Sequence, residues 1–244
     1  MKSTYYIYAI AALALSSCAQ EELLTKEAGT GTLQLSVSTR PLPQVVTTRA
    51  VDAGLVVDLY QSDGTLYKHF DAGEVPDRIE LQAGELYTVK VYTDNQQTWQ
   101  TANNGAGEAC YQGETTVTVG RDEMVSCVYQ VPMTNYAVTF TLPELFDQLF
   151  TSKTFTLTSG ERTVVLKEAG DKAYFSLADK GFKYQLQATN TDGKTSRHSV
   201  IEYPDVMAGK LFNVKYIYST DFSTGGIEID ITDNMEHENE DIEI

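Results

Sequence analysis

Cys18 is the residue whose chemistry the sequence specifies most clearly. It ends the run YYIYAIAALALSSC, which follows a single N-terminal lysine, Lys2. The apolar part of this run is too short to cross a bilayer as a helix, and it has the length of the apolar region of a signal peptide. The small residues before the cysteine let a processing peptidase approach, and the thiol then takes a lipid. The spacing therefore predicts a signal peptide over residues 1–17 and lipidation at Cys18, with an ordinary signal peptide and an incidental cysteine as the alternative.

A lipidated Cys18 would be anchored firmly, because each buried CH₂ group contributes about 0.8 kcal/mol. The sequence thus predicts an exported, lipid-anchored protein of the outer membrane with residues 18–30 as a polar tether. The acidic run Ala19-Gln20-Glu21-Glu22 directly after the cysteine resembles the surface-export signal of Bacteroidetes lipoproteins. This resemblance favours display on the cell surface over a purely structural tether.

Two further cysteines, Cys110 and Cys127, remain after the signal peptide. In an oxidising, exported setting they could form a disulfide. Cys127 is also in phase with Val125 and Tyr129, as expected for a buried thiol on a strand. Both alternatives stay open at the level of sequence.

The sequence carries no catalytic signature. Its histidines, His69, His198 and His237, lie on separate segments, and no HExxH, GxSxG or phosphate-binding loop is present. We therefore predict a non-enzymatic protein without a metal or cofactor. Four residues with side-chain oxygens near the C-terminus could attract Ca²⁺: Asp230, Asp233, Asn234 and Glu236. Their spacing misses the EF-hand pattern, so a solvated acidic end of the chain, with a tail over residues 233–244, is the better explanation.

Trp99 and Tyr111 lie at either end of a polar segment, residues 94–107, that is rich in Asn, Gln and Gly. Aromatic rings beside amide side chains can stack on sugars, so these two residues are candidate ligand contacts. A lone tryptophan is more often a packing residue, which makes glycan binding the alternative function here.

The chain has a formal net charge of −16. Such a surface repels phosphate backbones and disfavours electrostatic binding of nucleic acid.

Short segments of alternating apolar and polar residues recur along the chain. The segment 31–39 is typical, since Leu33, Leu35 and Val37 point to one side. Turn signals separate such segments at the spacing of a β-sandwich or barrel, and the pattern restarts after Pro132. The one predicted helix covers residues 143–150, where proline occupies the first helical position. We therefore predict an all-β chain with two sandwich domains, residues 31–133 and 134–232.

Several stretches, in this order, resemble the DUF4493 branch of the fimbrillin-like lipoproteins of Bacteroidetes, the broad group of type V pilus subunits and anchors. The stretches are GTLQLSV at 31–37, LQAGELYTVKV at 81–91, CYQG at 110–113, VSCV at 125–128, NYAVTF at 135–140 and TGGIEIDI at 224–231. The resemblance implies two transthyretin-like, Greek-key β-sandwich domains.

The resemblance also implies a mechanism of assembly. In pilus subunits of this group a protease cuts after an arginine in the loop that follows the first strand, and a strand of a neighbouring subunit replaces the strand that leaves. Here the loop offers Arg49 followed by Ala50, and the candidate donor strand carries Ile227, Ile229 and Ile231. A surface-loop arginine and an ordinary last strand are the alternatives.

Anchor proteins of the group keep the lipid and stay uncut. The acidic tail fits a stalk subunit poorly, so the resemblance favours a pilus anchor, accessory or adhesion protein whose partners are the outer membrane and pilus subunits or other surface proteins. The alternative is a surface module that binds a glycan or a host protein.

Overall fold

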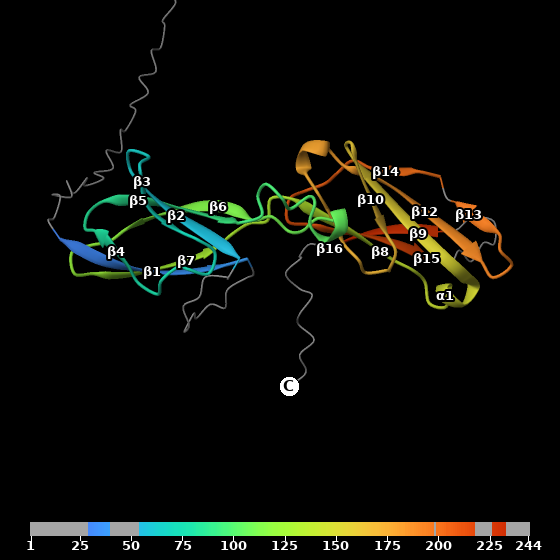
Figure 1. Ribbon diagram of the computed structural model, residues 1–244, viewed down its shortest axis with the longest axis horizontal. Coiled ribbons are helices and arrows are strands. Elements are labelled where there is room, and N and C mark those ends of the chain that lie inside the picture. The colour runs from blue at the N-terminus through green and yellow to red at the C-terminus, as the bar shows by residue number, and fades with distance from the viewer. Residues whose placement is uncertain (1–28, 40–53, 198, 218–225, 233–244) are drawn as a thin grey trace, which may run out of the picture.

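The computed structural model describes residues 29–39, 54–197, 199–217 and 226–232, and in the last range only the backbone. The strands fall into two groups that lie end to end along the long axis of the molecule (Figure 1). This arrangement confirms the all-β prediction. The predictions at Cys18, Arg49 and Ala50, the signal peptide and the acidic tail lie outside the described residues.

The N-terminal half, residues 30–130, forms two facing sheets in the strand orders β4-β1-β7 and β3-β2-β5-β6. Alternating apolar residues of both sheets meet between them, and Leu33, Leu59 and Tyr87 are fully buried there. The strands are β1 (Thr30–Ser38), β2 (Leu55–Gln61), β3 (Leu66–Phe70), β4 (Ile79–Gln82), β5 (Leu86–Thr93), β6 (Gln112–Thr118) and β7 (Met124–Gln130).

The C-terminal half, residues 136–232, repeats this two-layer plan. One sheet has the order β10-β9-β12-β13, with β14 also paired to β12, and the other has the order β11-β8-β15-β16. Its strands are β8 (Tyr136–Thr141), β9 (Phe150–Ser159), β10 (Arg162–Leu166), β11 (Ala173–Phe175), β12 (Phe182–Asn190), β13 (Thr195–Arg197), β14 (Ile201–Tyr203), β15 (Leu211–Ile217) and β16 (Gly226–Thr232).

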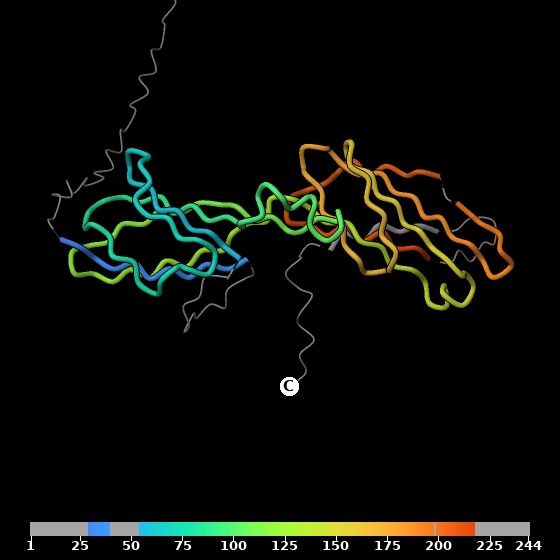
Figure 2. The backbone as a smooth tube through the Cα atoms, viewed as in Figure 1, coloured from blue at the N-terminus to red at the C-terminus, as the bar shows by residue number. Residues whose placement is uncertain are grey.

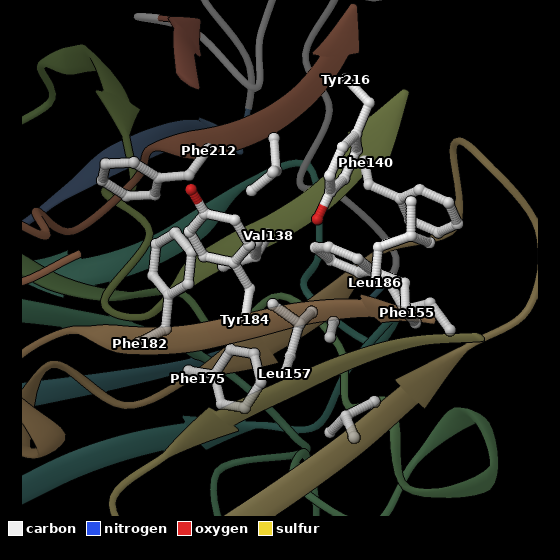
Figure 3. Packing of buried hydrophobic residues seen from close by; sticks show 14 of the residues in the cluster. Val138, Phe140, Phe155, Leu157, Phe175, Phe182, Tyr184, Leu186, Phe212 and Tyr216 are labelled. Atoms are coloured by element: carbon white, nitrogen blue, oxygen red, sulfur yellow. The ribbon is translucent and has the colours of Figure 1, made fainter. Parts of the chain in front are cut away.

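Aromatic side chains fill the core of the C-terminal half, as Figure 3 shows. The rings of Phe140 and Phe155 stack with centroids 4.5 Å apart, so β8 of one sheet contacts β9 of the other. Tyr136 is fully buried, and its hydroxyl donates to the carbonyl of Gly181 at 3.0 Å. Burial raises the pKa of Tyr136 to about 12, so this hydroxyl stays neutral at physiological pH.

Residues 131–135 connect the two halves, and the loop 94–110 of the N-terminal half reaches toward the C-terminal half beside this linker (Figure 2). The loop contains a short 3-10 turn, η1 (Asn103–Gly105). Each half has its own cluster of buried apolar residues. The division into two domains near residue 133 and the independent folding of each half stay predictions.

The predicted helix over residues 143–150 is shorter than expected. Helix α1 covers only Phe146–Leu149, and the preceding residue, Leu145, has a left-handed backbone with φ of 70°. Strand β9 already begins at Phe150, whose ring stacks on that of Phe146 at 4.3 Å. Packing of these two rings at the end of the sandwich therefore takes the place of a second helical turn.

Candidate functional site: the first strand and its neighbours

Strand β1 occupies the centre of a three-stranded sheet. It runs antiparallel to β4 over Thr30–Leu33, and it runs parallel to β7 from Thr32, opposite Met124, to Ser38, opposite Gln130. The parallel pair covers most of β1, whereas β4 covers only its beginning. A parallel pair of strands needs a long connection, and here the whole of β2 to β6 lies between the two strands in sequence.

The side chains of β1 are buried on both faces of the strand. Leu33, Leu35 and Val37 enter the core with exposed fractions of 0%, 2% and 0%, as the alternating pattern predicts. The opposite row is also buried, although it is polar: Gln34, Ser36 and Ser38. Because an apolar side chain contributes about 1.5–3 kcal/mol when buried, the three core residues alone hold this strand firmly in place.

The turn between β6 and β7 fixes the start of β1. The amide of Thr32 donates to the carbonyl of Glu123 at 2.7 Å, and the amide of Asp122 donates to the carbonyl of Thr30 at 2.9 Å. Gly31 lies so close to this turn that a Cβ atom on it would meet the carbonyl oxygen of Gly120 at 2.3 Å. Glycine is therefore required here for close approach of two backbones rather than for an unusual φ angle.

The candidate donor strand is β16, which pairs antiparallel with β15 of its own chain from Ile217, opposite Gly226, to Leu211, opposite Thr232. It is the last strand of its sheet. The side chains of Ile227, Ile229 and Ile231 lie outside the described part of the structure. The donor role stays a prediction, with β16 held in its own sheet by β15 on one side.

Cys110 and Cys127 are both free thiols in the structure, so it shows the unpaired alternative. Cys127 lies on β7 opposite Leu35 of β1, and burial raises the pKa of its thiol. Cys110 is buried in the loop between β5 and β6, where its backbone amide donates to the side-chain oxygen of Asn135 at 3.0 Å.

Trp99 is buried, with 9% of its surface exposed. The guanidinium of Arg162 lies 5.7 Å from the centre of its ring. Tyr111 is half-buried against the core of the N-terminal half and forms an isolated bridge with Met133. These positions count against the two rings as a platform on which a sugar could stack.

One polar cluster was missed by the sequence analysis. Asp58 on β2 is 7% exposed and accepts a hydrogen bond from the hydroxyl of Tyr92 at 3.0 Å. Its other carboxylate oxygen lies 2.6 Å from Nδ1 of His69, whose Nε2 lies 3.1 Å from Asp71. The two carboxylates raise the pKa of His69, with the hydrogen bond to Asp58 as the main cause. The pairing of β2 with β3 and with β5 brings these residues together.

Burial, together with the hydrogen bond to Asp58, raises the pKa of the neighbouring Tyr92 to about 12. Over the described ranges no group of three or more His, Cys, Asp or Glu residues could hold a metal ion. In the same residues no helix has the length and apolar character to span a membrane.

The fold is that of an all-β sandwich protein whose first strand is buried at the centre of a sheet between sequence-distant neighbours. The chain belongs to the DUF4493 family, a domain of unknown function, whose model matches residues 29–244. This match confirms the family resemblance found in the sequence. No curated protein matches the chain.

Solved structures share the fold at low sequence identity. A candidate cell adhesion protein from Bacteroides eggerthii is 10% identical, with 84% of this chain and 95% of that chain covered and a TM-score of 0.50. Another candidate cell adhesion protein, from Bacteroides uniformis, is 13% identical, with 84% and 98% covered and a TM-score of 0.50. The fimbrial anchor protein Mfa2 from Porphyromonas gingivalis is more distant, at 12% identity, 83% and 96% coverage and a TM-score of 0.36.

Proposed function

We propose that this protein is a non-enzymatic surface lipoprotein of the adhesion or pilus type, an anchor or accessory component that can assemble by β-strand exchange. The observation that carries the proposal is the central position of β1 between β4 and β7. The description of two structural neighbours as candidate cell adhesion proteins agrees with it.

Loss of β1 would open a groove of defined shape. It would leave unpaired backbone groups on β7 along Met124–Gln130, and it would remove three core side chains, Leu33, Leu35 and Val37, from between the two sheets. An extended strand with apolar residues at every second position repairs both defects at once. A donor such as residues 227–231, with isoleucines at alternate positions, has this pattern.

Lipidation at Cys18 would tether the chain to the outer membrane directly before β1. As long as the chain is intact, the lipid and β1 remain together. A cut after Arg49 would separate them from the rest of the protein, so the state of this bond distinguishes an anchor from a strand-exchanging subunit.

The test is the N-terminus of the protein in a sheared surface-filament fraction, determined by mass spectrometry. A chain that begins at Ala50 identifies a processed subunit. A chain that begins at lipidated Cys18 and travels with the filaments identifies an anchor. A chain found only in the membrane fraction, never with filaments, contradicts the pilus role and leaves a stand-alone surface protein.

Three variants make the test specific. Arg49→Ala should abolish any cleavage, whereas Arg78→Ala, at an exposed arginine directly before β4, should leave it unchanged. Cys18→Ser should release the protein from the membrane fraction. Unchanged membrane retention of Cys18→Ser would contradict the lipid anchor.

A further inference from the structure

Arg162 contacts both halves of the molecule. It lies at the start of β10 in the C-terminal half, and its Nη2 donates to two carbonyls of the loop 94–110, those of Gln100 at 2.9 Å and Gly105 at 2.5 Å. Its Nη1 donates to the carbonyl of Tyr174, on β11 of its own half. A single guanidinium therefore bridges backbone groups of both halves.

Two aromatic rings flank the same guanidinium. The ring centre of Trp99, from the N-terminal half, lies 5.7 Å from the guanidinium carbon, and that of Phe175, from the C-terminal half, lies 5.1 Å from it. Burial lowers the pKa of Arg162. Arginine nevertheless stays protonated in proteins, so a permanent cation lies between the two rings. Among the described residues no carboxylate forms an ion pair with it.

The surrounding hydrogen bonds fix the same loop to the C-terminal half and to the linker. The amide of Tyr174 donates to the carbonyl of Ala106 at 2.8 Å. The side chain of Asn135, which is 2% exposed, donates to the carbonyl of Glu108 at 2.8 Å. The backbone carbonyl of Asn135 accepts from the amide of Gly209 at 2.9 Å.

These contacts restrict the motion of the two halves relative to each other. Two domains connected by one short linker move relative to each other unless a substantial interface prevents it. The linker 131–135 gives one point of attachment, and the loop 94–110 gives a second through Arg162. The planar guanidinium donates in fixed directions, so its bonds restrict the angle between the halves as well as their distance.

We propose that Arg162 fixes the orientation of the two halves and makes the joint a rigid spacer instead of a hinge. The C-terminal half is then held at a constant direction from the N-terminal half, with α1 at the far end of the molecule (Figure 1). This inference is independent of strand exchange and of the cleavage at Arg49.

The experiment compares small-angle X-ray scattering of the mature chain carrying Cys18→Ser with that of the same chain carrying also Arg162→Ala. We expect Arg162→Ala to broaden the distribution of interatomic distances and to raise the radius of gyration, because the halves then sample many angles. Emission of Trp99, the only tryptophan, should shift to longer wavelength as its ring loses its cover. Arg197→Ala is the matched control, since the side chain of Arg197 donates to Gln187 of the same sheet and, within the described residues, makes no contact with the N-terminal half, so this change should alter neither observable.

Two results would overturn the proposal. One is a scattering curve of folded Arg162→Ala identical to that of the parent while Trp99 emission shifts, which would make the contact purely local. The other is a parent chain that already scatters as a flexible pair. If Arg162→Ala loses its β-sheet circular dichroism, Arg162→Lys replaces it, because lysine keeps the charge but not the fork of donors. Folded Arg162→Lys must then show the broadening, and a curve unchanged from the parent contradicts the proposal.

Discussion

Gly31 shows how a single residue decides whether β1 can dock. Its backbone packs against the carbonyl of Gly120, and any Cβ would come within 2.3 Å of that oxygen. We expect Gly31→Ala to destabilise the protein by about 1–3 kcal/mol, the usual cost of overpacking, measured by urea denaturation. Gly54→Ala is the control, because nothing lies within 4 Å of the added atom there. Equal stability of the two variants would contradict the close approach.

His69 makes the N-terminal half sensitive to pH. Asp58 and Asp71 raise the pKa of His69 in the folded state above the value of about 6.5 for an unfolded chain. The protonated ring therefore stabilises the fold fully below the unfolded pKa, and this contribution disappears as the pH rises through the higher, folded pKa. We expect His69→Gln to cost more stability at pH 5.5 than at pH 8.5 in urea denaturation.

The chain has two other histidines, so the comparison must be made between the variant and the parent at each pH. Asp71→Asn serves as a second check, because it removes one of the two carboxylates and should reduce the pH dependence in part. A loss of stability in His69→Gln that is the same at both pH values would show that the ring acts only through packing.

At the scale of elements, the residue before α1 adopts a backbone conformation that its residue type disfavours. Leu145 before the helix has φ of 70°, which is unfavourable for a leucine by about 1–2 kcal/mol, and its side chain is 57% exposed. We expect Leu145→Gly to leave the stability unchanged or raise it by up to about 1 kcal/mol, because glycine adopts this conformation freely. Thermal unfolding followed by circular dichroism measures the change.

The matched control is Leu149→Gly, at the end of the same helix. Leu149 is 50% exposed but has an ordinary helical backbone, so glycine should destabilise here by about 1 kcal/mol. If both glycine variants lose the same stability, the left-handed backbone at Leu145 is not a source of strain.

Alternation along the strands was enough to predict most of these elements. The row Leu33, Leu35, Val37 on β1 enters the core as expected, because side chains of a strand alternate between its faces. The row Tyr87, Val89, Val91 on β5 follows the same alternation. Helix α1 was overestimated, since the apolar spacing of residues 145–150 fits a helix and gives no sign that Phe146 and Phe150 pack on each other.

The contacts between elements could not be predicted in this way. The cluster of Asp58, His69 and Tyr92 depends on the register of three strands. The surroundings of Trp99 depend on Arg162, which also donates to the carbonyl of Gln100 in the same loop, 62 residues earlier in the chain. A sequence shows which face of a strand is apolar, but not which distant loop packs against it. For this reason the sequence alone offered Trp99 as a candidate ligand contact, whereas the structure buries its ring beside Arg162.

At the scale of the whole molecule, two hydrophobic clusters and one connecting linker suggest two units that could fold separately. The cluster of the C-terminal half draws its buried members from residues 136–216. We therefore predict that a chain of residues 134–244 folds alone, with a near-ultraviolet circular dichroism spectrum from its packed tyrosine and phenylalanine rings and a cooperative thermal transition.

The stability of this fragment should be lower than that of the same half in the intact protein, because the fragment lacks the loop 94–110 that packs on Arg162 and Tyr174. Addition of the Arg162→Ala change should then destabilise the fragment less than it destabilises the intact protein, because in the fragment the loop partners of Arg162 are already missing and only its contacts with Tyr174 and Phe175 remain to be lost. A fragment without near-ultraviolet signal or cooperative unfolding would show instead that the two halves form one folding unit.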